Sequence, residues 1–328
     1  MYTDTLSLIN SAKKVVVIQA ENPDGDSMGS ALALEEILSD AGKDVVLYCA
    51  IDIPKYMHYI RGWDRVTKDW PRDRDVAVIV DTASELLIQK ALETPGVRHF
   101  LESHPVLIID HHDSEASLPF ETTNLFVPSA VATGEIIYSL AQNAKWDINT
   151  QAAENLFISI QADSLGLTTQ NTTAESYTAA AELVALGASP HEIESRRREH
   201  MKKPADILTY KGELLQRIEY FLDGQFALVH IPWEEIQEYS DRYNPSVLVL
   251  DEMRLVEGVA IAVAVKTYPD GKATGKIRAN LPIAHLVAGY FGGGGHEYAA
   301  GFKLFEKYDT LIPEITKAVE KALSDYES

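Results

Sequence analysis

Carboxylates that stand beside short apolar runs are the groups in this sequence best suited to chemistry. In chain order they are Asp24, Asp26, Asp81, Asp110 and Asp163. Carboxylate oxygens are ligands that hard divalent cations prefer. Two such ions about 3.5–4 Å apart can share a hydroxide nucleophile and stabilise the leaving oxygen of a displacement. The pattern predicts a two-metal phosphoesterase.

The apolar runs before these acids predict how the acids are brought together. Val15–Gln19, Val76–Val80 and Val106–Ile109 are rich in β-branched residues, which is typical of buried parallel strands. Open α/β sheets bind ligands in the crevice beyond the carboxyl ends of their strands. We therefore expect the acids to converge in one crevice.

The first half of the chain alternates apolar runs with helical patterns, which indicates βαβ units. The further elements expected there are a helix over Ser30–Ala41, a strand over Asp44–Cys49, a helix over Ala152–Ile160 that Asp163 follows, and a helix from Pro190 to about Lys203.

The second half predicts a smaller, mixed sheet. The expected strands are Phe226–Ile231, Val247–Leu250, Val259–Thr267 and Ala273–Ala279. The last two flank Pro-Asp-Gly, a sequence that favours a hairpin turn. A glycine run from Gly292 to Gly295 and a terminal helix from Ile312 to about Tyr326 complete this half.

Chain length indicates two domains. The sequence has 328 residues, and single cores stop growing at roughly 250–300 residues. The expected fold class is α/β, with a mostly parallel sheet flanked by helices in a larger N-terminal domain, a mixed sheet in a smaller C-terminal domain, and a cleft between them. The expected boundaries are 1–195 for the metal-binding catalytic domain, 196–212 for a linker acting as a hinge, and 213–328 for the substrate-binding domain.

Composition excludes several classes of protein. The net charge of −20 opposes the binding of long nucleic acid, because there is no basic excess to displace phosphate counterions. No apolar run approaches the roughly 18 residues of a membrane helix, and the start has no export signal. Cys49 is the only cysteine, which rules out an internal disulfide and a thiolate zinc cage. These features predict a cytoplasmic protein that does not bind membranes.

Several short motifs carry a family resemblance. They are Asn22–Ser30, Asp81–Ser84, Asp110–Ser114, Ser129–Glu135, Ala162–Ser164 and Gly292–His296 followed by Ala299–Gly301. In this order they resemble the DHH superfamily of phosphoesterases, named for the triplet Asp110-His111-His112, together with its associated C-terminal domain. The resemblance covers nearly the whole chain. It is strongest to the branch of nanoRNases, 3′-phosphoadenosine-5′-phosphate (pAp) phosphatases, and enzymes that split pApA or cyclic di-AMP.

The resemblance implies a metal ligand at each matching acid. Asp24 would bind a first divalent ion and Asp26 a second, with Asp81 bridging the two. His111 and Asp163 would complete the second site. A mixed set of imidazole and carboxylate ligands favours manganese, with magnesium as the alternative.

The resemblance also implies catalytic and substrate-binding groups. Asp110 would orient an imidazole, and His112 would donate to the substrate phosphate. The implied phosphate-binding residues are Arg278, Gly293, Gly294, Gly295 and His296. The implied activity is hydrolysis of a short oligoribonucleotide, pApA, cyclic di-AMP or pAp by in-line attack of a metal-bound hydroxide, in a homodimer.

One position departs from the family pattern. The family's first motif opens with a metal-binding histidine four residues before the first aspartate, and here that position is Ala20. A methyl group cannot bind a metal ion, so an alternative function is nucleotide binding or regulation with weakened or lost catalysis. A third interpretation, pyrophosphatase or polyphosphatase, shares the metal motifs but is disfavoured by Arg278 and the glycine run.

Overall fold

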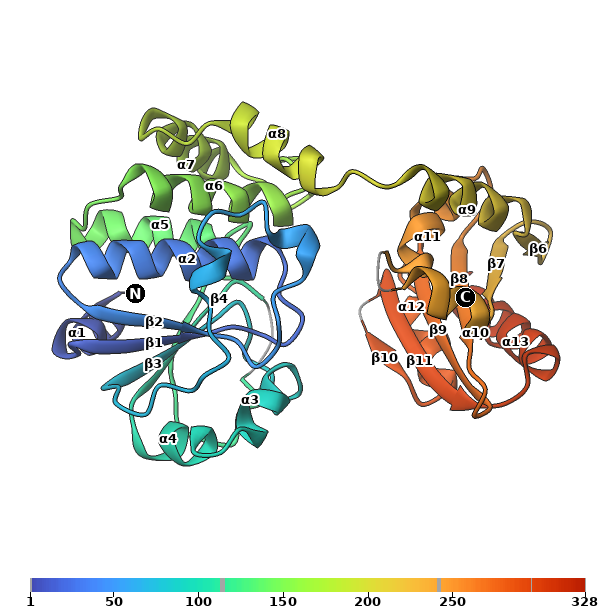
Figure 1. Cartoon of the computed structure of the whole chain (residues 1–328), viewed down its shortest axis with the longest axis horizontal. Coiled ribbons are helices and arrows are strands. Elements are labelled where there is room, and N and C mark those ends of the chain that lie inside the picture. Colours follow the sequence, from blue (N-terminus) through green and yellow to red (C-terminus); the bar gives the residue numbers. More distant parts are fainter. Residues whose placement is uncertain (1, 113–115, 241–242, 296, 328) are drawn as a thin grey trace. The chain divides into compact units, whose positions relative to one another are not determined.

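The computed structural model of the chain describes residues 2–112, 116–240, 243–295 and 297–327. The chain divides into two compact units, Met1–Lys202 and Lys203–Ser328. Each unit has one sheet with helices on both faces (Figure 1). This architecture confirms the predicted α/β fold class.

The first unit is built on a five-stranded parallel sheet with the strand order β2-β1-β3-β4-β5. Its strands are β1 (Lys14–Ile18), β2 (Asp44–Tyr48), β3 (Val76–Val80), β4 (Val106–Asp110) and β5 (Thr123–Phe126). β3 and β4 are buried along their whole length, because helices cover both of their faces.

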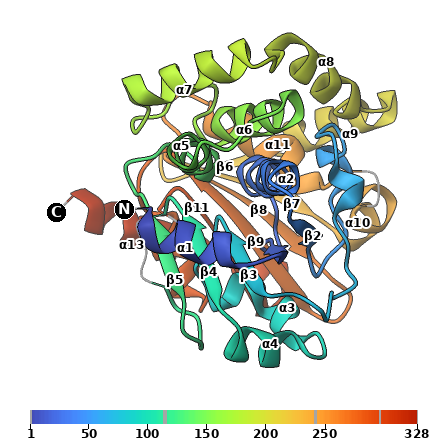
Figure 2. The same ribbon diagram turned by 90° about the vertical axis from the view of Figure 1, so that its left-hand side faces the viewer.

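Helices form two layers above one face of this sheet and one layer on the other. α2 (Gly25–Asp40) and α5 (Thr133–Ala144) lie on the first face, and α6 (Thr150–Asp163) packs on both of them. α7 (Ala174–Ala185) and α8 (Pro190–His200) lie outside α6 (Figure 2). The remaining helices are α1 (Thr3–Ser11), α3 (Gln89–Glu93) and α4 (Val97–Ser103), with the single 3-10 turns η1 (Lys55–Met57), η2 (Trp63–Arg65) and η3 (Glu85–Ile88).

Helix α2 begins earlier than the sequence pattern predicts. The expected start was Ser30, but the first helical residue is Gly25. Asp24 is the N-cap, since its carboxylate accepts from the Ser27 backbone N–H at 3.0 Å while the Ser27 hydroxyl accepts from the Asp24 N–H at 2.9 Å. This capping box satisfies two backbone donors of the first turn, and it places Asp26 inside the helix.

The second unit has a six-stranded sheet with the order β10-β11-β9-β8-β7-β6. Only β7 and β8 pair in parallel, so the sheet is mixed as predicted. Its strands are β6 (Glu219–Phe221), β7 (Phe226–Ile231), β8 (Ile261–Thr267), β9 (Lys272–Ala279), β10 (Gly294–Gly295) and β11 (Ala299–Phe305). Its helices are α9 (Ala205–Gln216), α10 (Trp233–Tyr239), α11 (Pro245–Arg254), α12 (Ala284–Tyr290) and α13 (Tyr308–Glu327).

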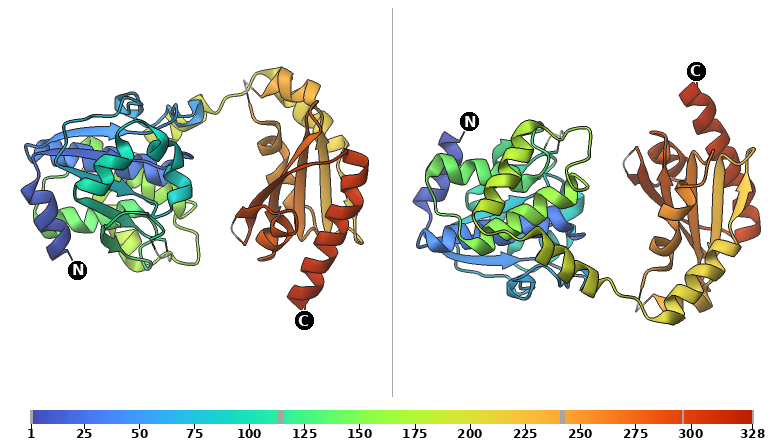
Figure 3. Two further views of the ribbon diagram at one scale, coloured as in Figure 1. Left: turned by 90° about the horizontal axis from the view of Figure 1, so that it is seen from below. Right: turned by 90° about the horizontal axis from the view of Figure 1, so that it is seen from above.

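Separate helices cover the two faces of the second sheet. Helices α9, α10 and α11 share one hydrophobic cluster with the first face, and α12 and α13 share another with the second. Figure 3 shows α13 running along its face of the sheet. Most of the predicted linker 196–212 is helical, since α8 ends at His200 and α9 begins at Ala205.

One predicted strand of the second unit is wrong. Val247–Leu250 lies inside helix α11. Asn244 caps this helix, with its side-chain oxygen accepting from the Ser246 N–H at 3.2 Å, and Pro245 occupies the first turn, where a missing N–H costs nothing. A four-residue apolar run alone does not distinguish a strand from a buried helix. Within the described parts of the chain, no helix combines the length and apolar character needed to cross a membrane.

Candidate metal centre

The elements of the first unit bring most of the predicted ligands to one place. Asp81 follows β3, Asp110 ends β4, His111 comes next, Asp26 lies in the first turn of α2, and Asp163 ends α6. Asp81 has a φ of 61°, in the left-handed region, which aspartate tolerates better than most residues. The chain therefore turns sharply at the end of β3 beside its neighbour β4.

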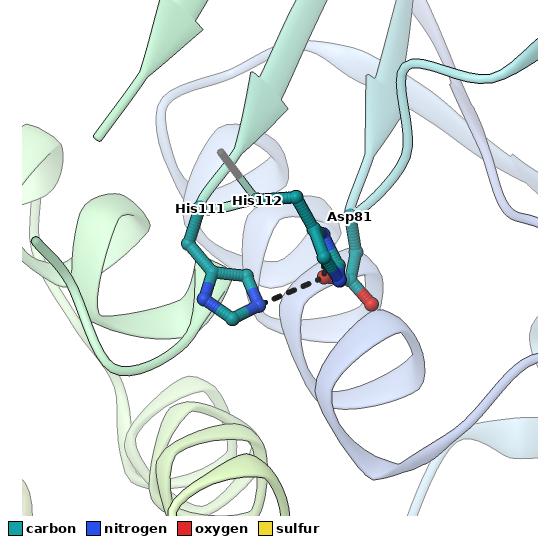
Figure 4. A group of neighbouring side chains, drawn as sticks. All are labelled: Asp81, His111 and His112. Carbon is teal, nitrogen blue, oxygen red and sulfur yellow. Dashed lines mark ion pairs between the residues drawn. The ribbon is translucent and has the colours of Figure 1, made fainter. Parts of the chain in front are cut away.

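The imidazole of His111 is at the centre of this group. Its Nε2 lies 3.2 Å from Asp163 Oδ2, 3.5 Å from Asp26 Oδ2 and 3.7 Å from Asp81 Oδ1. Figure 4 shows His111 and Asp81 facing each other from adjacent strand ends. His111 belongs to two groups of potential metal ligands, Asp81-His111-His112 and Asp26-His111-Asp163. In each group, all donor atoms lie within 4.8 Å of one another.

The position of His111 suits a metal ligand. Its Nδ1 is 3.4 Å from the Ala130 carbonyl oxygen, which can only accept a hydrogen bond, so a proton on Nδ1 would have a partner there. With that tautomer the buried Nε2 offers a lone pair, and it has no hydrogen-bond partner among the described residues. A divalent cation bound between this nitrogen and the three carboxylates would satisfy all four groups. The donor set therefore fits a divalent metal ion.

Asp26 is held by four donors that leave part of its carboxylate free. Its Oδ1 accepts from the hydroxyls of Ser30 at 2.9 Å and Ser159 at 2.5 Å, and from the Gly134 N–H at 3.3 Å. Its Oδ2 accepts from the Thr133 N–H at 2.8 Å. Because a carboxylate oxygen has two lone pairs, Oδ2 keeps one on the side that faces His111.

The charges of the cluster also fit a bound divalent cation. Burial and the neighbouring charge of Asp26 raise the pKa of Asp81 well above its usual value. Burial and Asp26 likewise raise the pKa of Asp163 to about 6. Closely spaced carboxylates take up protons because their negative charges repel one another. A divalent ion bound between them would neutralise this repulsion.

Comparison with known proteins agrees with this geometry. Residues 14–161 match the model of the DHH family, N-terminal domain. The first unit thus carries the N-terminal domain of the DHH family. The chain is 24% identical over 308 residues to the bifunctional oligoribonuclease and PAP phosphatase NrnA of Thermus thermophilus, covering 92% of this chain and 89% of the relative.

Solved structures share the fold of this chain. An exopolyphosphatase-related protein from Bacteroides fragilis superposes with a TM-score of 0.86 at 20% identity, covering 99% of this chain and 97% of that one. RecJ of Thermus thermophilus, solved in complex with Mn²⁺, superposes with a TM-score of 0.54 at 13% identity, covering 98% of this chain and 54% of that one.

Asp110 and His112 form a pair within the DHH triplet. Asp110 Oδ1 accepts from both the backbone N–H of His112 at 3.1 Å and its ring Nδ1 at 2.7 Å. The hydrogen bond to Asp110 raises the pKa of His112, whose side chain is 47% exposed. Asp110 thereby orients a ring that can donate to an anion, which supports the roles expected for both residues.

Asp24 and Ala20 leave the first metal position without the predicted ligands in place. Asp24 belongs to neither set of potential ligands, because its carboxylate caps α2. Ala20 is buried and offers no donor atom from its side chain. Of its neighbours, Glu21 accepts from the Lys90 backbone N–H, whereas the buried amide of Gln19 has no partner among the described residues.

The predicted phosphate-binding residues lie in the second unit. Arg278 is on β9 and donates from Nη1 to the Ile277 carbonyl at 3.0 Å. Gly294 and Gly295 form β10. A Cβ on Gly293 would lie 2.3 Å from the Gly301 carbonyl oxygen and one on Gly295 would lie 2.5 Å from the Ala300 Cα, so these two positions must be glycine for close pairing with β11. His296 lies outside the described residues.

Three hydroxyl residues of the centre were not predicted as site residues: Ser30, Thr133 and Ser159. The Thr133 hydroxyl donates to Asp81 Oδ1 at 3.0 Å, and the other two hold Asp26. Thr133 stands in the Ser129–Glu135 motif, which was a signal available in the sequence. Ser159 gave no such signal, because serine inside an apolar helix has no distinctive pattern.

Replacing Ser159 with alanine is expected to destabilise the first unit by about 1–3 kcal/mol. The Ser159 hydroxyl donates to Asp26 and accepts from the Gly134 N–H at 2.9 Å, so its removal takes a donor from the buried Asp26 carboxylate and leaves the Gly134 N–H with only its longer contact to Asp26 at 3.3 Å. Urea unfolding measures the loss. Ser7→Ala, on the exposed side of α1, is the control and should change stability by less than about 0.5 kcal/mol. An equal effect of the two changes would contradict the structural role of Ser159.

Proposed function

We propose that this chain is a metal-dependent hydrolase of short nucleotides. The observation that carries the proposal is the buried Nε2 of His111, unpartnered and facing the carboxylates of Asp26, Asp81 and Asp163. The relative NrnA is named as an oligoribonuclease and PAP phosphatase, which supports short nucleotides as the substrate class.

Residues of the first unit would bind the metal ions and hold the metal ligands in place. Asp26, Asp81, His111 and Asp163 would hold the divalent ions. Asp24, the N-cap of α2, would bind the first of them. When bound, such ions lower the pKa of water and neutralise charge on phosphate oxygens. Thr133 fixes Asp81 by donating to its Oδ1.

The remaining predicted residues would act on the substrate. His112, held by Asp110, would donate to a non-bridging phosphate oxygen. Arg278 would bind a terminal phosphate, since a guanidinium donates two parallel hydrogen bonds to such a group. The segment 196–212 would act as a hinge between the two units.

Turnover of defined nucleotides tests the proposal. The purified chain is expected to hydrolyse at least one of pApA, pAp and a short RNA in the presence of manganese, and to stop when EDTA removes the metal. A chain that binds manganese and nucleotide but hydrolyses none of the three would establish the alternative, a nucleotide-binding protein on the same scaffold.

Ala20 is the observation that favours this alternative, and restoring the family histidine tests it. Ala20→His adds an imidazole where the family has a metal ligand, so manganese affinity and hydrolysis are each expected to rise by at least about tenfold, the lower limit seen for residues that only support a ligand. Calorimetric titration of manganese and initial rates measure the two effects. Ala20→Leu fills similar space without a ligand atom and should produce neither gain. Equal behaviour of the two variants would mean that the centre does not need this ligand.

A further inference from the structure

Lys266, Lys276 and Arg278 lie on one face of the second sheet, which also carries Lys272 and Lys303 further along β9 and β11. Strand register pairs Ala262 with Arg278 and Ala264 with Lys276 across β8 and β9. Residues opposite each other in an antiparallel pair lie on the same face, and every second residue of a strand returns to that face. Lys266, two residues after Ala264, therefore lies on the same face as Lys276 and Arg278.

The surroundings of this basic face leave it accessible beside β11. The other face of the same strands is packed against α12 and α13 through residues such as Val263 and Ile277. On the basic face, α9 and α11 pack over Ala262 and Ala264. On the β11 side, only the small residues Ala299 and Gly301 stand opposite Arg278 and Lys276, and Lys276 is exposed.

Within the described ranges, no carboxylate forms an ion pair with Lys266, Lys276 or Arg278. Lys266 donates to the neutral Asn244 side-chain oxygen at 2.8 Å, and Arg278 donates to a backbone carbonyl. In a chain with 49 acidic and 29 basic residues, a row of three cations that pair with no described carboxylate is not explained by folding stability.

Electrostatic repulsion between these basic groups also indicates that the face binds an anion. Burial and the nearby charge of Lys276 lower the pKa of Lys266 to about 8. Burial and Arg278 likewise lower the pKa of Lys276. An anion bound between them would relieve the repulsion, and a dianion would do so more than a monoanion.

We propose that Lys266 and Lys276 extend the Arg278 site into a binding site for the terminal phosphomonoester of a nucleotide. The inference rests on the proposed function and adds a substrate preference to it. A terminal phosphomonoester is a dianion near neutral pH, whereas a phosphodiester linkage carries one negative charge. The protein thus selects short nucleotides that end in a phosphate over those that end in a hydroxyl.

Two dinucleotides that differ only in this group test the preference. For the full-length chain with manganese, kcat/KM is expected to be higher for pApA than for ApA. Lys276→Met and Lys266→Met are each expected to reduce this ratio by roughly tenfold, the value of one hydrogen bond to a charged group, while kcat/KM for ApA stays unchanged. Lys317→Met removes the same charge from α13, which covers the opposite face, and should leave the ratio unchanged.

A binding measurement separates this inference from the proposed function. Calorimetric titration of AMP and adenosine into the full-length chain in EDTA needs no catalysis, and Lys276→Met should weaken AMP binding by roughly tenfold without affecting adenosine. If neither dinucleotide is hydrolysed but AMP binding behaves in this way, the proposed function fails and the phosphate site stands. If hydrolysis occurs with the same pApA-to-ApA ratio in the lysine variants, or AMP binds no better than adenosine, the phosphate site is overturned.

Discussion

Replacing Asp81 with asparagine is expected to lower the rate of nucleotide hydrolysis by at least about 100-fold, because changes that only disturb the support of a metal ligand already cost 10–100-fold. Asp81 is buried at the centre of the carboxylate group, and its Oδ1 faces His111 Nε2 at 3.7 Å. Asparagine keeps the shape, tolerates the φ of 61°, and retains an oxygen for the Thr133 hydroxyl, so the variant should fold. Initial rates at saturating manganese, together with manganese titration, measure the loss.

The control for this change is Asp147→Asn, on the exposed loop between α5 and α6. This change removes the same charge from a loop that is not part of the metal centre. The rate should stay within about twofold of the native rate, because surface substitutions usually have small effects. An Asp81→Asn protein that kept half of the native rate would show that Asp81 is not a metal ligand in the reaction.

Gly29→Ala is expected to destabilise the first unit by about 1–3 kcal/mol or more and to lower activity at the same time. A Cβ on Gly29 would lie 2.5 Å from the Asn155 carbonyl oxygen and 3.0 Å from the Ser159 N. Both are backbone atoms of α6, so α2 and α6 would have to separate. Asp26 on α2 and Ser159 on α6 form a 2.5 Å hydrogen bond across this contact, and the separation would disturb it.

Gly212→Ala provides the matched control for this prediction. Gly212 lies inside helix α9, and a Cβ there would meet nothing within 4 Å. Alanine favours helix over glycine by roughly 0.5–1 kcal/mol, so this change should stabilise the protein slightly. Denaturant unfolding followed by circular dichroism compares the two variants. Equal stability of the two would mean that α2 and α6 are not packed as closely as the structure has them.

The strands and the convergence of acids could be predicted from the sequence because both depend on short-range patterns. The β-branched runs before Asp81 and Asp110 predict β3 and β4 nearly to the residue, with burial on both faces. Parallel strands in one sheet end at the same edge, so the positions of Asp81 and His111 follow from topology alone. The family resemblance is confirmed, while the assignment of each ligand to a metal position stays a prediction.

What the sequence pattern did not predict depends on contacts between distant segments. Ser159 reaches Asp26 only because Gly29 and Gly134 allow α2, α5 and α6 to approach closely. The sequence periodicity of α6 does not indicate how closely this helix approaches α2 and α5. Lys276 could not be linked to Lys266 without the register of β8 and β9, since ten residues separate them along the chain. The helix over 245–254 was missed because its cap and first-turn proline were outweighed by a short apolar run.

Each buried hydrophobic cluster described above draws its residues from one unit only, on either side of residue 203. Mutations that reshape one unit therefore leave the interior of the other intact. Over evolutionary time, a lineage can vary the surface around β8, β9 and β11 and acquire new substrates without repacking the helices that hold Asp26 and Asp163. Under the proposed function, natural variants of this architecture can thus diversify in what the second unit recognises while the proposed metal centre stays the same.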